Sequence, residues 1–396
     1  MAAKKQHFSS IQRFNSTWVN NKEKVNKEMV KAGEDNLFPQ YLISLYNKSS
    51  IHAAAVNAIT EAVVGGGLTA NDEAFIDKAN KTGETWNDIF AKVSLDFYLH
   101  GSFALEIIWS LDRSRIAEVY HIDFSTIRAR EKNHRGHIPG YYIADEWKPF
   151  TRVTNDDILY LPTFNENTKQ DEPSQIFVVK NYRPGQQYYP LPFYNGALKV
   201  IELDTEIDNF HVNNIKNGLA PSLAITTFMN GTDDDVQAVE AMLRGNYGGS
   251  DNAGSMMYMD VDSPENKPII EPIPQNGADG YYTTINDLTV QKILTAHRIT
   301  SPMLLGIKTE GQLGGRAEMI DAMQLLQHNV INPIQQDILK QLEAVMTINY
   351  PEIVLGVETV TLFDDGTTEE EVVTSVETTD AEDTAIQTED TSAPLL

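Results

Sequence analysis

The residue types that usually carry chemistry are present in this chain, but their spacing does not form a catalytic motif. Of the nine histidines, His211, His297 and His328 could each contribute a metal ligand, yet none has a second ligand at helical spacing. The chain has no cysteine, which excludes thiolate chemistry, thiolate metal sites and disulfide bonds. No Gly-x-Ser-x-Gly, His-Glu-x-x-His or Walker sequence occurs. The sequence therefore predicts no enzyme activity, no cofactor and no metal site.

Two glycine-rich stretches and one acidic run could hold a phosphate or a cation, but each has a simpler structural explanation. Gly65-Gly66-Gly67 lacks the Lys-Ser/Thr pair of a phosphate loop and follows a helical pattern, so we expect it to end a helix. The stretch GGSDNAG at 248–254 also lacks that pair and is expected to be a turn. Asp233-Asp234-Asp235 does not match an EF-hand loop, and capping of a following helix explains it.

Charged residues on the predicted helix 196–217 could act on a polyanion. Four acids lie off its apolar positions: Glu202, Asp204, Glu206 and Asp208. If they face outward, they repel a polyanion and keep contacts with its phosphates few. The alternative is that they form ion pairs between subunits with the bases of the same region, which are Lys199, Lys216, Lys292 and Arg298. The sequence leaves both interpretations open.

A long, glycine-rich and almost uncharged loop is predicted at 300–315, between two helices. Its candidate site residues, with the first residue of the next helix, are Lys308, Glu310, Gly311, Gln312, Gly314, Gly315 and Arg316. Loops of this length are usually functional or disordered. Lys308 and Arg316 are the only positive groups among them.

Apolar periodicity predicts the helices that position these groups. Steps of three and four residues predict helices over 196–217, 279–299 and 316–350. The apolar stripe of the last helix is Met319, Met323, Leu326, Val330, Ile334, Ile338, Leu342 and Val345. Pro333 lies inside that helix, so we expect a kink near Asn332. Residues 218–278 are predicted to form a small α/β insertion between the first two helices.

The preceding part of the chain predicts an α+β arrangement. Helices are expected from Pro39 to Gly65 and over 86–98. Five short β-rich runs then predict an antiparallel sheet: SFALEIIWS, IAEVYHID, STIRARE, GYYIAD and DILYLP. Residues 163–195 are rich in Asn, Gln, Pro, Tyr and Gly and are predicted to be a loop region.

Charge is concentrated at the two ends of the chain. Residues 364–396 contain eleven acids and no Lys or Arg, so the other residues carry −14 of the formal net charge of −25. Residues 351–396 are therefore expected to be a strand-like segment followed by a disordered acidic tail. Residues 1–35 form a basic arm, either mobile or docked on a neighbouring subunit through Phe8, Ile11, Phe14, Trp18 and Val19. The acidic body argues against tight nonspecific DNA binding, and no apolar run of ~18 residues predicts a membrane span.

The order of these parts resembles tailed-bacteriophage portal proteins of the HK97-like group. The stretches that carry the resemblance are LYNKSSIHAAAVNAITEAVVGGGL at 45–68, YLHGSFALEIIW at 98–109, NNIKNGLAPSLAI at 213–225, and HRITSPMLLGI followed by a glycine-rich loop and a helix with Asn332-Pro333. The similarity extends over roughly residues 36–350. There is little sequence for the folded crown of larger portals.

The resemblance implies a portal fold with an α/β wing, a two-helix stem, a clip, a tunnel loop and a long kinked helix. In chain order, the wing is residues 36–195, the stem is helices 196–217 and 279–299, the clip is residues 218–278, the tunnel loop is residues 300–315 and the long helix is residues 316–350. The resemblance would place the four acids of helix 196–217 along a channel, where they repel DNA. It would place the candidate residues of the loop facing the DNA, with a few weak phosphate contacts that suit sliding or gating. It also implies a ring, usually a dodecamer, at the capsid vertex of the virion, assembled in the host cytoplasm, through which double-stranded DNA passes non-specifically. The terminase large subunit and the tail adaptor would dock on the clip, with Asp233, Asp234, Arg244 and Tyr247 as candidate surface residues, and the major capsid protein would surround the ring.

Two other classes of function remain as alternatives at this point. One is another virion connector or scaffold-binding structural protein, which would share the helical organisation but not the docking partners. The other is an enzyme such as an acid-rich hydrolase, and the missing catalytic constellation weighs against it.

Overall fold

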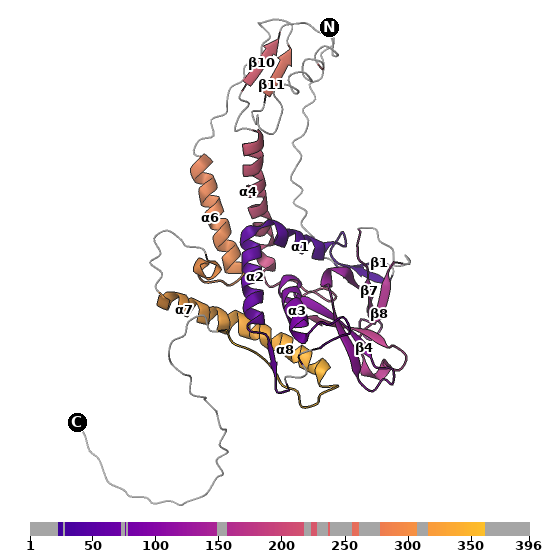
Figure 1. Ribbon diagram of the computed structural model, residues 1–396. Coiled ribbons are helices and arrows are strands. Elements are labelled where there is room, and N and C mark those ends of the chain that lie inside the picture. The colour runs from indigo at the N-terminus through magenta and orange to yellow at the C-terminus, as the bar shows by residue number, and fades with distance from the viewer. Residues whose placement is uncertain are drawn as a thin grey trace, which may run out of the picture. The chain divides into compact units, whose positions relative to one another are not determined.

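The computed structural model describes residues 23–26, 28–72, 76, 78–148, 157–217, 223–227, 237, 256–260, 278–306 and 316–360. The chain divides after Thr359, and every element named below belongs to the unit Met1–Thr359. Helices pack beside antiparallel sheets in this unit (Figure 1). The α+β class expected from the sequence is therefore confirmed. None of the helices in the described ranges is long and apolar enough to cross a membrane.

Three helices form the helical layer of the wing: α1 (Phe38–Lys48), α2 (Ser50–Val64) and α3 (Trp86–His100). The single helix expected between Pro39 and Gly65 is instead two, because Ser49 is extended and its hydroxyl caps α2 by accepting from the His52 N–H at 3.2 Å. Thr85 and Asp88 form a capping box at the start of α3. These local bonds set where the helices begin.

Glycines end two of these helices, as expected for Gly65. Its φ of +55° and the nearby Glu358 carbonyl, 2.7 Å from where a Cβ would lie, leave no room for a side chain. This close approach allows β3 (Leu68–Ala70) to pair with β12 (Leu355–Val357). Gly101 ends α3 in the left-handed region at φ +76°.

Two three-stranded antiparallel sheets pack beside the helices. The first has the order β5-β4-β9, and the second has the order β6-β7-β8. Their strands are β4 (Ser102–Trp109), β5 (Ile116–Ile122), β6 (Ile127–Ala129), β7 (Gly140–Ile143), β8 (Leu159–Pro162) and β9 (Ser174–Lys180). The five predicted β-runs are confirmed as β4 to β8. The prediction of a loop over 163–195 is wrong for β9, which pairs with the buried strand β4 along seven residues.

The end of the basic arm packs on the wing of its own chain. Strand β1 (Lys24–Asn26) pairs with β2 (Met29–Lys31), and Met29 and Val30 are buried. The Glu23 carboxylate accepts backbone N–H groups of Gln187, Tyr188 and Tyr189 at 2.6 to 3.1 Å. From Glu23 onward the arm therefore packs on its own chain. The apolar residues proposed for such docking, Phe8 to Val19, lie outside the described part.

A buried arginine joins α1 to the second sheet. The Arg128 guanidinium donates to the Asn36 carbonyl, the Asn36 side chain, Gln40 and the carbonyls of Ser125 and Ile127. Burial lowers the pKa of Arg128 to about 10. All five bonds go to neutral oxygens, and the charge of Asp35 also favours the guanidinium form.

The long C-terminal helix is continuous but irregular at the place that Pro333 predicts. It consists of α7 (Arg316–Leu326), a π-helical turn (Gln327–Ile331) and α8 (Asn332–Met346). Proline has no N–H to donate, and the wider π-turn before it accommodates the missing bond. The expected apolar stripe is buried from Leu326 to Val345, while Met319 and Met323 are half-buried. Gln335 donates to the Val63 carbonyl at 2.9 Å and holds α8 on α2.

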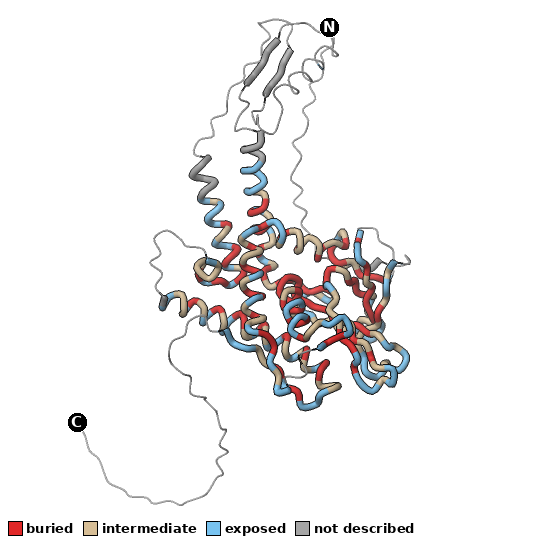
Figure 2. The backbone as a smooth tube through the Cα atoms, in the orientation of Figure 1, coloured by how far each residue is buried: buried red, intermediate tan, exposed pale blue. Residues whose placement is uncertain are grey.

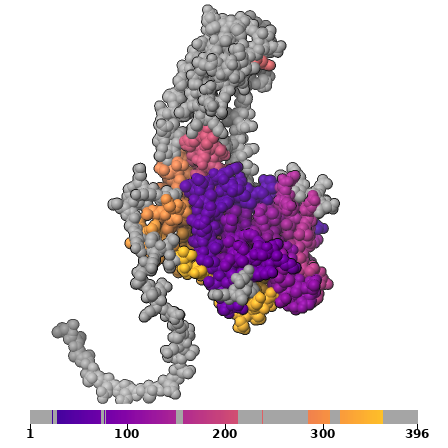
Figure 3. All heavy atoms as spheres, viewed as in Figure 1, coloured from indigo at the N-terminus to yellow at the C-terminus, as the bar shows by residue number. Residues whose placement is uncertain are grey.

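Two further helices, α4 (Leu198–Asn217) and α6 (Ala278–Ala296), lie side by side and extend away from α1 and α2 (Figure 1). Between them in the chain, β10 (Leu223–Thr227) pairs in parallel with β11 (Met256–Asp260). The two expected helices and the strands of the α/β insertion are thus present. At their lower ends α4 and α6 contact α1 and α2, as the adjoining coloured atoms show (Figure 3).

Candidate functional site

Helices α4 and α6, the predicted stem helices, include exposed residues along their described lengths (Figure 2). On the inner side of each helix, Ile201, Ile293 and Leu294 are buried. On the outer sides, Leu203 and Phe210 of α4 and Leu288 of α6 keep between 38% and 47% of their surface exposed. Val212 is also exposed, but it follows Ile201 by eleven residues and so lies on the inner face of α4. Single exposed apolar residues are common, but three on the outer sides of one helix pair mark a candidate surface for another protein.

The four predicted channel acids do not share one environment. Asp204 is 5% exposed and accepts the Ser49 hydroxyl at 2.7 Å, and burial raises its pKa. Its carboxylate therefore joins the stem to the cap of α2 and cannot line a channel, which corrects the expectation for this residue. Glu202 and Glu206 are half-buried, and Asp208 is exposed. These three acids remain candidates for a channel surface.

Glu202 also interacts with the wing. Burial, followed by the charge of Glu202 and a hydrogen bond to it, raises the pKa of Tyr41 to about 12. In contrast, no ion pair joins Glu206 or Asp208 to Lys292 or Arg298 within the described chain.

At the base of the stem, side chains from four segments meet in a space closed to water. The His52 Nδ1 and His297 Nε2 atoms share a hydrogen bond of 2.9 Å, and the Tyr98 hydroxyl bonds His297 Nδ1 at 2.8 Å. The Tyr194 ring lies 4.5 Å from the His52 ring, and its hydroxyl donates to the Leu99 carbonyl at 2.9 Å. We call this group, His52, Tyr98, Tyr194 and His297, the stem-base cluster.

Burial determines the charge of the stem-base cluster. It lowers the pKa of His52 to about 4 and, with the neighbouring His52 as a smaller cause, that of His297 to about 3. Both imidazoles are therefore neutral near pH 7. Both ring nitrogens of His297 have bonded partners, so the suggestion of a metal ligand at this residue finds no support. The cluster acts as a structural joint between α6, α2 and α3.

The chain leaves the stem through a tight turn at the end of α6. Arg298 has a φ of +60°, and the Ile299 N–H returns to the Leu294 carbonyl at 3.0 Å. Ser301 then caps a short 3₁₀ turn (Pro302–Leu305), which ends at Gly306 with φ +74°. The first third of the predicted loop is thus an ordered turn.

The other predicted site residues cannot be placed. In the loop these are Lys308, Glu310, Gly311, Gln312, Gly314 and Gly315, together with the side chain of Arg316. In the insertion they are Asp233, Asp234, Arg244 and Tyr247. All of them lie outside the described residues, so their roles stay predictions.

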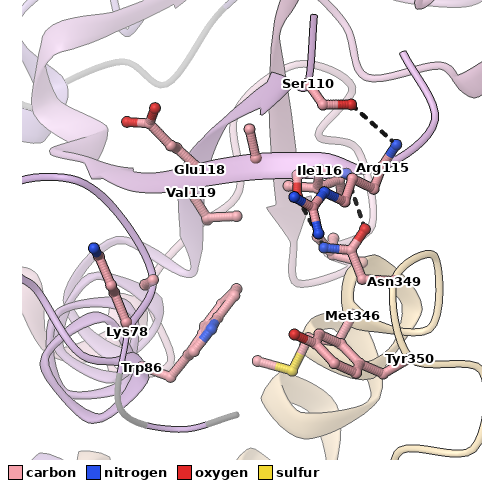
Figure 4. Close-up of a pocket in the computed structure, with 13 residues that line it drawn as sticks. Lys78, Trp86, Ser110, Arg115, Ile116, Glu118, Val119, Met346, Asn349 and Tyr350 are labelled. Atoms are coloured by element: carbon pink, nitrogen blue, oxygen red, sulfur yellow. Dashed lines mark hydrogen bonds between the residues drawn. The ribbon is translucent and has the colours of Figure 1, made fainter. Parts of the chain in front are cut away.

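A hollow of about 280 Å³ lies between β5, the start of α3 and the end of α8 (Figure 4). Asn349 clamps the strand there, because its side chain accepts from the Ile116 N–H and donates to the Ile116 carbonyl, both at 2.9 Å. The residues that line the hollow include one carboxylate, Glu118, and no histidine. This lining does not offer the histidine–carboxylate pair of a general acid–base site.

Sequence reasoning did not identify the stem-base cluster or the Ser49–Asp204 bond. The bonded pairs are separated by 245, 199 and 155 residues, so no spacing along the chain could reveal them. The periodic apolar positions predicted the two stem helices. They gave no indication of which residues hold the ends of these helices against α1, α2 and α3.

Comparisons with known proteins agree with this architecture. A family model described as phage portal protein matches residues 73–357. A chain of the virion of the native gene transfer agent particle is 15% identical, with a TM-score of 0.54, over 81% of this chain and 85% of that chain. A chain of the neck of the empty gene transfer agent particle is 16% identical, with a TM-score of 0.54, over 81% and 84%.

A further solved structure, an HK97-family phage portal protein from Corynebacterium diphtheriae, is 11% identical with a TM-score of 0.41, over 79% of this chain and 93% of that chain. No curated protein matches the sequence. At these identities the two gene transfer agent structures show a shared fold. The family model covers well over half of the 396 residues. The chain therefore belongs to the phage portal protein family.

Proposed function

We propose that this chain assembles into a ring of twelve subunits at one vertex of a capsid, and that the ring is the channel for DNA during packaging and ejection. Membership of the portal family supports the proposal. The observation that carries it is the exposed apolar surface of α4 and α6. In a ring, that surface is covered by the same helices of neighbouring subunits.

The free energy available from this surface is substantial. Burying the exposed part of Leu203, Phe210 and Leu288 contributes about 1 kcal/mol each, at roughly 25 cal/mol per Å² of apolar area. A ring repeats the contact at every interface and closes without a free end. The wing, with its large buried core, is the rigid frame on which such a ring is built.

Glu202, Glu206 and Asp208 are the proposed channel acids. Repeated in every subunit, they form an acidic wall that repels phosphate and lets DNA slide. Their alternative is to pair between subunits with Lys199, Lys292 or Arg298. The ion-pair alternative is compatible with the same ring but places the acids within interfaces, where they would fix the orientation of neighbouring stems.

The remaining parts have assigned roles in this proposal. Residues 218–278 are the clip, on which the terminase large subunit and later the tail adaptor dock, and residues 300–315 are the tunnel loop. The major capsid protein surrounds the wing in the virion, and assembly takes place in the host cytoplasm. We assign the chain a structural role and no catalytic activity.

A charge placed on the exposed stem surface tests the ring. We expect the double variant L203E/L288E to remain monomeric in native mass spectrometry and electron microscopy, because like charges then face each other across each interface. The matched control is Leu111→Glu, at a fully exposed leucine outside the stem, which should assemble as the unmodified chain does. Rings formed by L203E/L288E, or an unmodified chain that stays monomeric at micromolar concentration in every ionic condition, would contradict the proposal.

A further inference from the structure

A cluster of side chains in the wing, away from the stem, has the donor set of a divalent-cation site. Asp96 and His100 lie four residues apart in the last turns of α3, and Asp123 follows the end of β5. One carboxylate oxygen of each aspartate and one ring nitrogen of His100 all lie within 4.8 Å of one another. Helical spacing of four residues places Asp96 and His100 on one face, so a single ion can reach both.

The two carboxylates lack a permanent positive charge to neutralise them. Asp96 Oδ2 accepts the Phe124 N–H at 3.1 Å and bonds His121 Nε2 at 2.8 Å. Asp123 Oδ1 accepts the Ser125 N–H at 2.8 Å. No lysine or arginine forms an ion pair with either carboxylate in the described ranges.

The neighbouring Arg128 does not supply the missing charge. The Arg128 guanidinium donates its hydrogen bonds to neutral oxygens of Asn36, Gln40, Ser125 and Ile127. Asp96 is buried and Asp123 is exposed, and a buried carboxylate without a paired charge is unfavourable unless a proton or a cation compensates it. The cluster thus has an electrostatic reason to hold a cation.

His100 is the second, independent indication. It is 2% exposed, and its Nδ1 atom is buried without a hydrogen-bond partner. An unpaired imidazole beside two carboxylates is an arrangement that a metal ion completes, because histidine is a common metal ligand.

We infer that Asp96, His100 and Asp123 bind a divalent ion of the zinc class. One nitrogen and two carboxylate donors suit Zn²⁺ better than Ca²⁺ or Mg²⁺, which prefer oxygen ligands alone. His121 is a positioning residue, because its bond to Asp96 Oδ2 leaves the other oxygen for the ion. Ligands of a tetrahedral ion lie roughly 3.4 Å apart at bond lengths of about 2.1 Å. The exposed Asp123 side chain can close that remaining distance.

Such an ion would tie the C-terminal end of α3 to the end of β5. Asp96 already contacts the Phe124 backbone, and the His100 ring lies 5.6 Å from the Phe124 ring. The site is therefore structural, and its fourth position, next to the exposed Asp123, is open to water.

The test is zinc binding by the untagged, full-length chain after treatment with a chelator. We expect one Zn²⁺ per chain by calorimetry and elemental analysis. Asp123→Asn should weaken the affinity at least about tenfold, because it removes one charged ligand. Asn retains an acceptor for the Ser125 N–H, so the local turn is kept.

Asp112→Asn is the matched control, because Asp112 Oδ1 accepts the N–H of Ser114 two residues on, at 3.2 Å, as Asp123 does with Ser125. It should bind Zn²⁺ like the unmodified chain. The inference is overturned if the unmodified chain takes up no stoichiometric Zn²⁺, if D123N and a folded His100→Gln variant both bind it normally, or if Mg²⁺ and Ca²⁺ bind as tightly as Zn²⁺. Circular dichroism of each variant verifies folding.

Discussion

At the scale of single residues, the stem-base cluster shows how burial determines charge. His52 and His297 are bonded to each other in a site closed to water, and desolvation lowers the pKa of each far below the usual value of about 6.5. The His52 Nε2 atom has no partner there, so even the neutral form is incompletely satisfied. A proton added to either ring would place an uncompensated charge in the joint between stem and wing.

This arrangement predicts a specific dependence of stability on pH. The folded-state pKa values of about 4 and 3 lie below the unfolded value, so the unfolded chain takes up protons first as the pH falls. The contribution of the pair is fully present above about pH 6.5 and is lost as the pH falls towards 4. Below the unfolded pKa, each histidine lowers the free energy of unfolding by about 1.4 kcal/mol per pH unit, because the unfolded chain binds the proton and the folded chain does not. Between pH 7 and 5 the loss is roughly 2 kcal/mol for each ring.

Urea denaturation at pH 7 and pH 5 measures this loss. Variants His52→Gln and His297→Gln should show a smaller difference between the two pH values, whatever their stability at pH 7, because glutamine does not titrate. His134→Gln, at an exposed histidine, is the control and should leave the difference unchanged. Equal pH dependence in all four proteins would show that other groups cause it.

At the scale of elements, the two predicted stem helices extend away from the helices of the wing, and both have their lower ends against them. Helix α4 leaves beside α1, and α6 returns beside α2, with the Ser49–Asp204 bond and the stem-base cluster fixing the two lower ends. The chain then turns at Arg298 and Ser301 before α7 begins. The predicted loop 300–315 therefore follows the end of α6 and precedes α7.

The loop itself should matter for DNA and not for assembly. We predict that deleting residues 308–314 leaves rings intact in electron microscopy but reduces DNA packaging or retention, because the deletion removes chain that faces the tunnel and leaves the stem surface unchanged. Replacement of the same residues by a Gly-Ser sequence of equal length separates the effect of length from that of side chains. Normal packaging by the deletion variant would exclude a role in the tunnel.

At the scale of the whole molecule, charge and folding are divided between different parts of the sequence. The described core is built by residues between Met29 and Leu355, whereas 364–396 contributes eleven negative charges. That composition offers little apolar area to bury. The acidic end therefore affects solubility and interactions more than the stability of the fold.

Removal of residues 366–396 tests this division. We expect the melting temperature to change by no more than about 2 °C, because the truncation removes no side chain of the described core. Differential scanning calorimetry of the truncated and full-length chains measures the melting temperature. A deletion of equal length that begins at residue 29, the N-terminal end of the described core, would serve as a destabilising reference. A large fall in melting temperature after the C-terminal truncation would show that this segment packs on the rest.

The sequence by itself determined the properties that depend on neighbouring residues. Apolar periodicity identified the stem helices and the long C-terminal helix, Pro333 identified its irregular turn, and Gly65 identified the end of α2, because each is a local requirement of backbone geometry. The resemblance of ordered motifs also identified the portal family that the family model confirms.

The tertiary structure alone decided which distant residues meet. It paired β9 with β4 in a region that composition predicts as loop, and it buried Asp204 against Ser49 although its spacing matched that of the exposed acids. It also brought His52 to His297, and Asp123 to Asp96 and His100. The physical reason is that burial and desolvation depend on the complete fold, so the charge and role of these groups are not a property of their sequence neighbours.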